Sequence, residues 1–309
     1  MSEISIVIPF YNESDSITKT LDSLNKQTYQ PDEVILVDSG SDDNTCNLIN
    51  KWIEDNQTNK FKIIYSGKMS PSSSINLGVR NAKNNLIGYL DCGLFVPNNW
   101  IESNVKIIKQ SNCDMVSVMI YTKGQNYIDK SLVAQSYGYK NKTACLTGSI
   151  IKKSIIKKLN YFLENCRASY DIDFINKFKK NNYTREVNTK IILNYYDINF
   201  SSNYHEAIQK VFRYSKNAWL AYGDLKPISY ILLTVFIIII PYNYYYNIIL
   251  FYFILRGYIT PYLKSKNLEL FKEIPLLALL PLSGFIFDIS RLAGYIYSLP
   301  SSIINDKQN

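Results

Sequence analysis

Two aspartates stand directly after short apolar runs that are typical of buried strands. Asp38 follows residues 34–37, and Asp91 follows residues 86–90. In a parallel sheet the carboxyl ends of the strands meet at one edge, and ligands of open α/β sheets bind along that edge. The two aspartates are therefore the first side chains that we expect at a binding site.

The histidine and cysteine content excludes several kinds of site. The chain has one histidine, His205, so a histidine-rich zinc site is excluded and a histidine-based catalytic triad could use only this residue. Its five cysteines are odd in number, widely spaced and without a CxxC pair. This pattern is typical of a reducing compartment and does not indicate a disulfide framework.

The elements that must position these side chains alternate along the chain. Strands are expected at residues 4–10, 34–37, 61–65, 86–90 and 115–121, with helical spacing after residue 17, through 45–52, over 72–83 and over 100–108. Beyond residue 130 the pattern predicts helices over 151–159, 171–178 and 204–222 and a strand over 190–194. The alternation predicts an α/β fold in which helices cover both faces of a mostly parallel sheet.

Residues 227–255 carry no charged side chain. Residues 228–240 would form a helix of about 20 Å, too short for a hydrocarbon core of about 30 Å. One interpretation is a kinked helix that runs past residue 247. The other, which the distribution of lysine and arginine favours, is a hairpin over about 228–263 that turns at 241–247.

A third apolar segment, residues 274–299, is interrupted by two charged residues. Asp288 and Arg291 are three positions apart and can meet on one face of a helix. The segment is expected to cross a membrane or to lie in its interface.

Charge is segregated along the 309 residues, whose formal net charge is +8. Residues 1–129 hold 11 basic and 15 acidic side chains, and residues 130–226 hold 17 and 7. Because the basic part precedes the apolar segments, it is expected to attract anionic lipid head groups or a lipid diphosphate. No sequence pattern of an RNA- or DNA-binding module is present, so nucleic acid is not an expected partner.

Several blocks of sequence, in their order and spacing, resemble family 2 glycosyltransferases of the GT-A fold, in the branch associated with membranes. The blocks are SIVIPFYNE (5–13), DEVILVDSGSDDNT (32–45), SINLGV (74–79), IGYLDCG (87–93), TG (147–148), RASYDIDF (167–174) and FRYS (212–215). The resemblance covers roughly residues 3–225. It implies a Rossmann-like, mostly parallel sheet followed by C-terminal transmembrane or interfacial helices.

The resemblance implies a nucleotide-sugar donor. Asp38 would accept hydrogen bonds from the base or ribose, although the same acidic turn could instead serve to cap the next helix through Asp42 or Asp43. The residues implied in donor binding are Pro9, Tyr11, Glu13, Asp38, Asn76 and Asp91.

Asp91 matches the first acidic residue of the family's D-x-D motif, which holds a divalent cation on the diphosphate. The third position here is Gly93. Mg²⁺ or Mn²⁺ would then take most of its oxygen ligands from phosphate and water, with Asp91 as the protein ligand. The family's later metal-side histidine is also missing, and Asp197 is a possible substitute. His205 is expected at the surface.

The resemblance also places a general base at the start of a helix, where Asp171 is the first choice and Asp173 the second, with Tyr170 in place of the family's glutamate. Either aspartate could instead cap the helix. Direct displacement would invert the anomeric centre. Gly148, Arg167 and Arg213 are expected on the acceptor or phosphate side.

We therefore expect a GT-A domain over residues 1–226, with a nucleotide-sugar half at 1–129 and an acceptor half at 130–226. Membrane segments over 227–299 and a tail over 300–309 follow. The expected function is a membrane-associated inverting glycosyltransferase that uses a lipid-linked or glycan acceptor in the synthesis of cell-surface polysaccharide or glycolipid. The alternative is a catalytically weakened scaffold that binds nucleotide sugar or glycan.

The expected location is a membrane, with multi-pass or hairpin anchoring and membrane lipids as partners. The first residues lack the basic and apolar regions of a secretory signal peptide, so the catalytic domain is expected in the cytoplasm.

Overall fold

The computed structural model describes residues 4–195 and 200–305, which belong to two compact units. The sheet unit comprises Met1–Ile120 and Thr143–Tyr196, and the helical unit comprises Tyr121–Lys142 and Asp197–Asn309. The domain boundaries expected from the sequence stay predictions.

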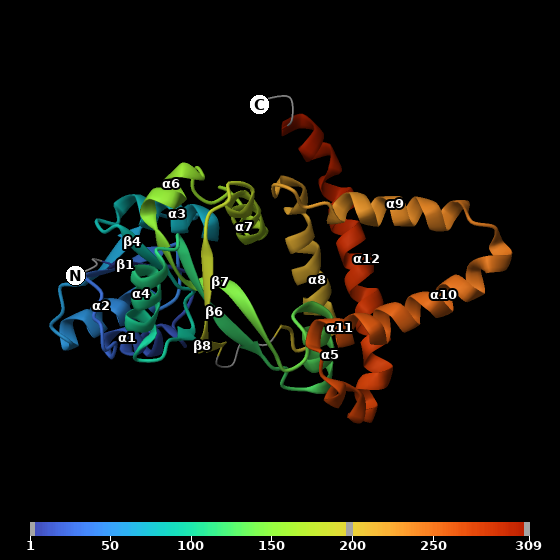
Figure 1. Ribbon diagram of the computed structural model, residues 1–309, viewed down its shortest axis with the longest axis horizontal. Helices are drawn as coiled ribbons and strands as arrows, with labels where there is room; N and C mark the ends of the chain where they lie inside the picture. Colours follow the sequence, from blue (N-terminus) through green and yellow to red (C-terminus); the bar gives the residue numbers. More distant parts are fainter. Residues whose placement is uncertain (1–3, 196–199, 306–309) are drawn as a thin grey trace. The chain divides into compact units, whose positions relative to one another are not determined.

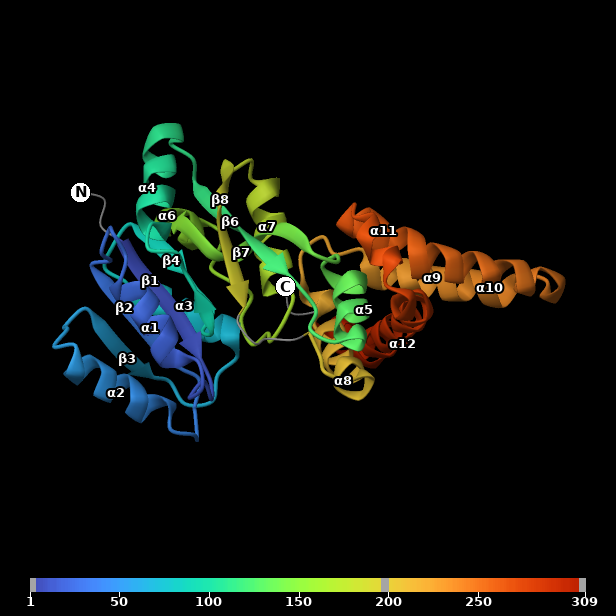
Figure 2. The same cartoon turned by 90° about the horizontal axis from the view of Figure 1, so that it is seen from below.

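An eight-stranded sheet forms the centre of the sheet unit, in the order β3-β2-β1-β4-β7-β6-β8-β5 (Figure 2). The strands are β1 (Ile4–Phe10), β2 (Glu33–Asp38), β3 (Phe61–Tyr65), β4 (Leu86–Tyr89), β5 (Leu94–Phe95), β6 (Met115–Thr122), β7 (Asn141–Lys152) and β8 (Arg185–Tyr195). The four strands β3, β2, β1 and β4 are parallel, whereas β7 runs antiparallel to β4 and β5 antiparallel to β8. The predicted α/β fold is confirmed, with a parallel half-sheet that becomes mixed beyond β4.

Helices cover both faces of this sheet, as the alternating pattern predicts (Figure 1). One face carries α1 (Ile17–Asn25), α2 (Thr45–Asp55) and α4 (Trp100–Ser111). The other carries α3 (Pro71–Asn81), α6 (Lys153–Lys158) and α7 (Tyr170–Lys180). Alternate residues of β1 divide between the layers: Ile6 and Ile8 pack into the first and Val7 into the second. Burial on both faces explains why β1 and β2 are almost continuously apolar.

The sequence prediction is wrong at β7. A helix was expected over residues 151–159, but β7 continues to Lys152 and α6 covers only Lys153–Lys158. Ile150 and Ile151 pair with Gly88 and Ile87 of β4. Because the first half of β7 is polar, it lacks the apolar alternation that identifies a half-buried strand. Tertiary pairing with β4 therefore outweighs the helical spacing of the isoleucines that follow.

The helical unit is built around a long C-terminal helix. Its elements are α5 (Tyr127–Ser136), α8 (Tyr204–Ser215), η1 (Ala218–Leu220), α9 (Lys226–Ile239), η2 (Tyr242–Tyr244), α10 (Tyr245–Ile254), η3 (Leu255–Ile259), α11 (Thr260–Ser265), η4 (Leu268–Lys272) and α12 (Ile274–Asn305). Phe287 of α12 is fully buried in a cluster with Leu132 and Val133 of α5 and Val211 of α8. The helix predicted over 204–222 is interrupted, because α8 ends at Ser215 and the short helix η1 follows.

The chain turns sharply between α9 and α10, which Figure 1 shows meeting at a tip. The bend between Lys226–Ile239 and Tyr242–Ser265 is 112°. Pro241 stands two residues after the end of α9, and Ile240 before it is extended, as a residue that precedes proline prefers, which explains the break. Of the two interpretations of this segment, the turned pair of helices agrees with the structure.

Large apolar side chains on these helices are exposed. Leu232, Phe236 and Ile239 of α9 have 63%, 60% and 75% of their surface exposed, and Phe251 of α10 has 62%. Within the described residues, one helix, Ile274–Leu299, is long and apolar enough to cross a membrane, and the bent pair adds a second if it counts as one span. These lengths do not support a multi-pass arrangement.

Candidate functional site

The predicted site lies where the parallel strands end. The chain passes from β1 to β2 and β3 on one side, and β4 pairs with the other side of β1. The point between β1 and β4 is therefore a topological switch point, where open α/β sheets bind ligands at the carboxyl ends of their strands. The loop after β1 carries Tyr11 and Glu13, and the turn after β4 carries Asp91.

The loops after β1 and β2 are tied to each other by hydrogen bonds. Asn12 Nδ2 donates to Asp42 Oδ1 at 2.6 Å, and the backbone N–H of Asp42 donates to Asn12 Oδ1 at 3.0 Å. The backbone N–H of Glu13 donates to Thr45 Oγ1 at 2.8 Å. These bonds make one wall from two loops that are far apart in the sequence.

Asp43 stabilises the start of the next helix, which was the alternative explanation for this acidic turn. Its Oδ1 accepts the backbone N–H of Thr45 at 3.0 Å at the start of α2, and its Oδ2 accepts that of Ser14 at 3.2 Å. Asp38 is distinct from it: the side chain is 6% exposed, and Oδ1 accepts the N–H of Ser41 at 2.9 Å. Because Asp43 stabilises the helix start, the turn does not need Asp38 for that purpose.

Pro9 and Tyr11 stand at the end of β1. Pro9 pairs with Val37 of β2 and is partly buried. The Tyr11 side chain is 45% exposed just beyond the strand, so its ring can contact a ligand at this edge.

Glu13 is partly buried in acidic surroundings. Burial, together with the neighbouring carboxylates of Asp91, Asp43 and Asp15, raises the pKa of its carboxyl above the usual value, although a hydrogen bond from Ser16 acts in the opposite direction. The Ser16 hydroxyl donates to Glu13 Oε2 at 2.5 Å. The carboxyl groups of Glu13 and Asp91 are thus close enough to influence each other's charge.

Asp91 is held by groups that sequence reasoning missed. The Tyr89 hydroxyl donates a short hydrogen bond to Asp91 Oδ1, and the Asp91 N–H donates to Thr147 Oγ1 of β7 at 2.9 Å. The Tyr89 hydroxyl also lies 3.3 Å from that of Tyr170, the first residue of α7. Burial and the Asp91 carboxylate raise the Tyr89 pKa well above its usual value, so this phenol stays a donor. The sequence did hold a signal for the Tyr89–Asp91 contact. The tyrosine stands two positions before the aspartate, and alternate residues of a strand share a face.

The structure limits the protein's contribution to a metal site. Among residues 4–195 and 200–305, no group of three or more His, Cys, Asp or Glu side chains could hold a metal ion. Gly93, in place of a second aspartate, adopts a φ of +82°, and its N–H donates to Thr20 Oγ1 at 3.2 Å. A cation at this edge would therefore take most of its ligands from a bound diphosphate and water. Asp91 as its protein ligand stays a prediction.

Asp197 and His205 are the other two residues considered for this metal. Asp197 lies outside the described residues. His205 is exposed on α8, where its Nε2 lies 2.9 Å from Gln209 Nε2.

The two candidate bases occupy different environments in the first turn of α7. The Asp171 side chain is exposed, whereas Asp173 is 1% exposed and its Oδ2 lies 2.8 Å from Lys177 Nζ. Ser169, which precedes the helix, has a φ of +70°, so the chain enters α7 through a left-handed residue. An exposed carboxylate at a helix start can accept a proton from a ligand, whereas a buried ion-paired one is a packing element.

Two residues predicted to contact ligand have structural partners. Asn76 is fully buried on α3; its Nδ2 donates to the Phe162 carbonyl at 2.8 Å, and its Oδ1 accepts the Phe162 N–H at 2.9 Å. Gly148 in β7 has a φ of +76°, and an added Cβ would lie 2.4 Å from Leu193 Cδ1. Their ligand contacts stay predictions.

Two arginines complete the predicted set. Arg167 is exposed in the loop before α7, in the sheet unit. Arg213 is exposed on α8, in the helical unit.

Comparison with known proteins agrees with this geometry. The sequence matches the model named Glycosyl transferase family 2 over residues 5–160. The glycosyltransferase GlyG of Streptococcus pneumoniae is 29% identical over 149 residues, 44% of this chain and 49% of GlyG. The undecaprenyl-phosphate 4-deoxy-4-formamido-L-arabinose transferase of Serratia proteamaculans is 28% identical over 134 residues, 42% of this chain and 41% of that protein. The chain thus spans about half the length of the curated relatives it matches, or less.

A solved structure shares the fold. The mannosyltransferase PcManGT from Pyrobaculum calidifontis, in complex with GDP-Man and Mn²⁺, superposes with a TM-score of 0.56 at 16% identity, covering 96% of this chain and 87% of that chain.

Proposed function

Because this chain belongs to glycosyl transferase family 2, we propose that it transfers a sugar from a nucleotide-sugar donor to an acceptor. The observation that carries the proposal is the grouping of polar side chains at the carboxyl ends of β1, β2 and β4. Asp91 at this edge connects through the hydroxyls of Tyr89 and Tyr170 to α7, which bears Asp171. A donor-binding edge is thereby linked to a helix with an exposed carboxylate.

On the donor side, Pro9, Tyr11 and Glu13 would line the nucleotide pocket, and Asp38 would accept hydrogen bonds from the base or ribose. Asp38 can do so because a carboxylate offers about four acceptor positions, of which the Ser41 N–H takes one on Oδ1. Asp91 would be the protein ligand of Mg²⁺ or Mn²⁺, in keeping with the Mn²⁺ bound by the mannosyltransferase of similar fold. When bound, the cation supplies positive charge to the diphosphate leaving group.

On the acceptor side, we assign the general base to Asp171. Its carboxylate would take the proton of the acceptor hydroxyl as the acceptor oxygen bonds to the anomeric carbon. The bond between that carbon and the diphosphate oxygen breaks on the opposite face, so the anomeric centre inverts. Arg167, in the loop before α7, would meet negative charge on the donor or acceptor.

The second aspartate of α7 has a different role in this proposal. Asp173 is almost fully buried against Lys177 and would hold the helix in place without touching substrate. Asp171 and Asp173 thus differ by burial although both lie in the first helical turn.

We also propose that the protein is associated with a membrane and uses a lipid-linked or glycan acceptor, in the synthesis of a cell-surface polysaccharide or glycolipid. The exposed apolar faces of α9 and α10 and the length of α12 support this, because such surfaces are costly in water. One relative is named as an undecaprenyl-phosphate 4-deoxy-4-formamido-L-arabinose transferase. Lysines and arginines flank the apolar helices, which favours a cytoplasmic sheet unit, and Arg213 would face lipid head groups.

The experiment is transfer or hydrolysis by membranes that contain the full chain. Membranes are incubated with UDP- and GDP-linked sugars, with and without Mn²⁺, and release of nucleoside diphosphate is measured. We expect release with at least one donor, a greater rate with Mn²⁺, and loss in Asp171→Asn. Inactivity with every donor would contradict the proposal.

A scaffold that binds a nucleotide sugar without turnover is the second candidate. Gly93 in place of an acidic residue favours it, because only Asp91 remains of the motif. Saturable nucleotide binding without any release from donor sugars would support the scaffold and exclude the transferase.

A further inference from the structure

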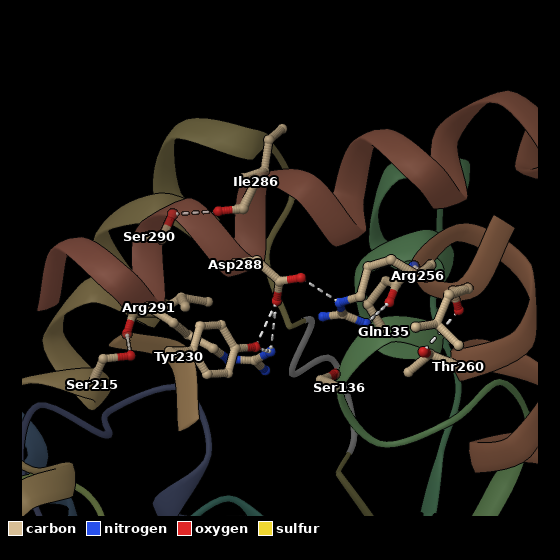
Figure 3. Close-up of polar contacts among 12 residues, drawn as sticks. Gln135, Ser136, Ser215, Tyr230, Arg256, Thr260, Ile286, Asp288, Ser290 and Arg291 are labelled. Carbon is tan, nitrogen blue, oxygen red and sulfur yellow. Dashed lines mark hydrogen bonds and ion pairs between the residues drawn. The ribbon is translucent and has the colours of Figure 1, made fainter. Parts of the chain in front are cut away.

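Asp288, in the middle of the apolar helix α12, binds four side chains, which come from α9, α10, η3 and α12 itself. Figure 3 shows those of Tyr230, Arg256 and Arg291 around it. Its Oδ1 accepts the Tyr230 hydroxyl at 2.7 Å and lies 3.4 Å from Arg291 Nη1. Its Oδ2 accepts the Tyr252 hydroxyl at 3.0 Å and Arg256 Nε at 2.6 Å. A carboxylate offers about four lone-pair positions, so this one has no capacity left.

The cluster holds more positive than negative charge. Two guanidinium groups, those of Arg256 and Arg291, share the single carboxylate of Asp288. Three other carboxylates of the helical unit have lysine partners of their own: Glu273 pairs with Lys130 at 2.6 Å, Glu269 with Lys140 at 2.9 Å, and Asp224 with Lys226 at 3.9 Å. One positive charge is thus left over among apolar helices, where an uncompensated charge is costly.

One nitrogen of the buried arginine also lacks an acceptor. Arg256 is 8% exposed; its Nε donates to Asp288 and its Nη1 to Gln135 Oε1 of α5. Its Nη2 is buried without a hydrogen-bond partner among the described residues. Buried donors are nearly always satisfied, and an unsatisfied charged donor is the costliest kind.

The backbone that presents Arg256 is itself irregular. Arg256 lies in the π-helical turn η3, Leu255–Ile259, between α10 and α11. Pro261, which has no N–H to donate, follows within the next turn, and this accounts for the change in hydrogen bonding. Gly257 packs against Pro281 of α12, where an added Cβ would lie 2.7 Å from Pro281 Cγ. The turn is therefore pressed against α12, and Arg256 is held beside Asp288.

We propose that this cluster, comprising Arg256, Arg291, Asp288, Tyr230, Tyr252 and Gln135, binds the phosphate group of an amphiphilic lipid. A phosphate would supply the missing negative charge and accept from Arg256 Nη2 and from the guanidinium group of Arg291. This site lies in the helical unit and requires no sugar donor, so the inference does not depend on the proposed sugar transfer, although it rests on the proposed association with a membrane.

The surroundings of the cluster indicate why the phosphate belongs to a lipid. Next to it in sequence, Leu255 is 39% exposed and Ile289 is 51% exposed, and one helical turn from Asp288, Phe285 is 42% exposed. A hydrocarbon chain attached to the phosphate would cover these apolar side chains, which a free inorganic ion would leave exposed. Arg291, with 25% of its side chain exposed, is the accessible edge of the site. Arg256 Nη2 is covered, so the lipid reaches it by displacing the Tyr230 hydroxyl, which contacts both Asp288 and Arg291.

The test is a titration of the full-length protein in an uncharged maltoside detergent. Dodecyl phosphate and inorganic phosphate are the two probes, and binding is followed by calorimetry. We expect the wild type to bind dodecyl phosphate saturably. The affinity of Arg291→Gln for dodecyl phosphate should be lower by about tenfold or more, because a charge-assisted pair of hydrogen bonds is lost. Lys272→Gln is the matched control: it removes an exposed positive charge of η4 outside the cluster and is expected to change affinity by less than about twofold.

A third variant separates binding from structural support. Asp288→Asn removes the negative charge that competes with the ligand, so it is expected to raise the affinity for dodecyl phosphate; a purely structural ion pair predicts no increase. If this variant does not fold, the comparison of Arg291→Gln with Lys272→Gln decides.

The probes distinguish the source of the phosphate. Tighter binding of dodecyl phosphate than of inorganic phosphate supports a lipid ligand, whereas equal affinity and mutual competition would overturn the lipid in favour of a free anion. Absence of saturable binding by either probe, or equal binding by wild type and Arg291→Gln, would overturn the site itself.

Discussion

The two aspartates at the start of α7 allow a matched test, because the same change in each should have opposite consequences. Asp171→Asn and Asp173→Asn both replace a carboxylate by an amide of equal shape, two residues apart. The account assigns proton transfer to the exposed Asp171 and structural support to Asp173, which is 1% exposed. One variant should therefore lose turnover and the other stability.

The magnitudes follow from burial. Breaking a fully buried ion pair costs about 3–5 kcal/mol. The Lys177 side chain is 31% exposed and can turn to solvent once Asp173 is neutral, so we expect about 2 kcal/mol, or roughly 4–8 °C in Tm. Asp171→Asn removes an exposed charge near the helix N-terminus, and a charge in such a position is worth about 0.3–1 kcal/mol. Its turnover should fall by about 10²–10⁴, the usual contribution of a general base.

The assays are thermal unfolding followed by tryptophan fluorescence, and release of nucleoside diphosphate from the donor that the wild type uses. Lys177→Gln should also lower Tm, because it leaves the Asp173 carboxylate buried without its lysine, and the double variant Asp173→Asn/Lys177→Gln should recover part of the loss. Loss of turnover in Asp173→Asn at unchanged Tm, with an active Asp171→Asn, would refute the assignment.

Three further predictions concern packing, pH and membrane binding. Gly148→Ala should lower the free energy of unfolding, measured with urea, by about 2–4 kcal/mol, because the added Cβ would meet Leu193. Gly67 has a similar positive φ of +68° but open space around it, so Gly67→Ala should lower that free energy by only about 1 kcal/mol. Equal losses in the two variants would contradict a role for packing at Gly148. The pKa of the Glu13 carboxyl is raised in the folded protein, so folding favours the protonated form. The stability that this protonated carboxyl contributes is therefore fully present below pH 4.5 and is lost as pH rises through the raised pKa. Glu13→Gln should remove that decline, so its Tm should gain on the wild type between pH 4.5 and 7, and parallel Tm curves would exclude the effect. Replacing the exposed Leu232 and Phe236 together by glutamate should shift the protein from the membrane pellet toward the supernatant after an alkaline carbonate wash, and an unchanged distribution would contradict membrane contact by α9.

The parallel half of the sheet was predictable because its strands are buried on both faces. The expected bounds of β1 and β3 agree with the structure, whereas β2 extends one residue further at each end and β4 ends one residue earlier. Such strands are continuous runs of apolar residues, which a sequence displays directly. In β7 and β8, polar and charged residues alternate irregularly, and pairing with neighbours determines the strand.

The site was predictable in part for a similar reason. Asp38 and Asp91 could be placed because each follows a recognisable strand. Burial of Asp173 and the connection from Tyr89 to Tyr170 depend on the packing of α7, which joins the sheet from far along the chain. No local pattern carries that information.

Only part of the charged cluster around Asp288 could be predicted from the sequence. The spacing of Asp288 and Arg291 predicts a pair on one helix face, and the structure contains it at 3.4 Å. Arg256, which approaches within 2.6 Å, comes from a segment 32 residues earlier and depends on the turn at Pro241.

The central claim is that the carboxyl ends of β1, β2 and β4 form a nucleotide-sugar site. Its most direct test is calorimetric titration of the full-length protein with UDP, GDP and their sugars in the presence of Mn²⁺, for wild type, Asp38→Ala and the matched surface variant Asp55→Ala at the end of α2. The account predicts saturable binding of one nucleotide family, weakened about tenfold or more in Asp38→Ala and unchanged in Asp55→Ala. Absence of binding across the panel, or equal affinity in all three proteins, would contradict it.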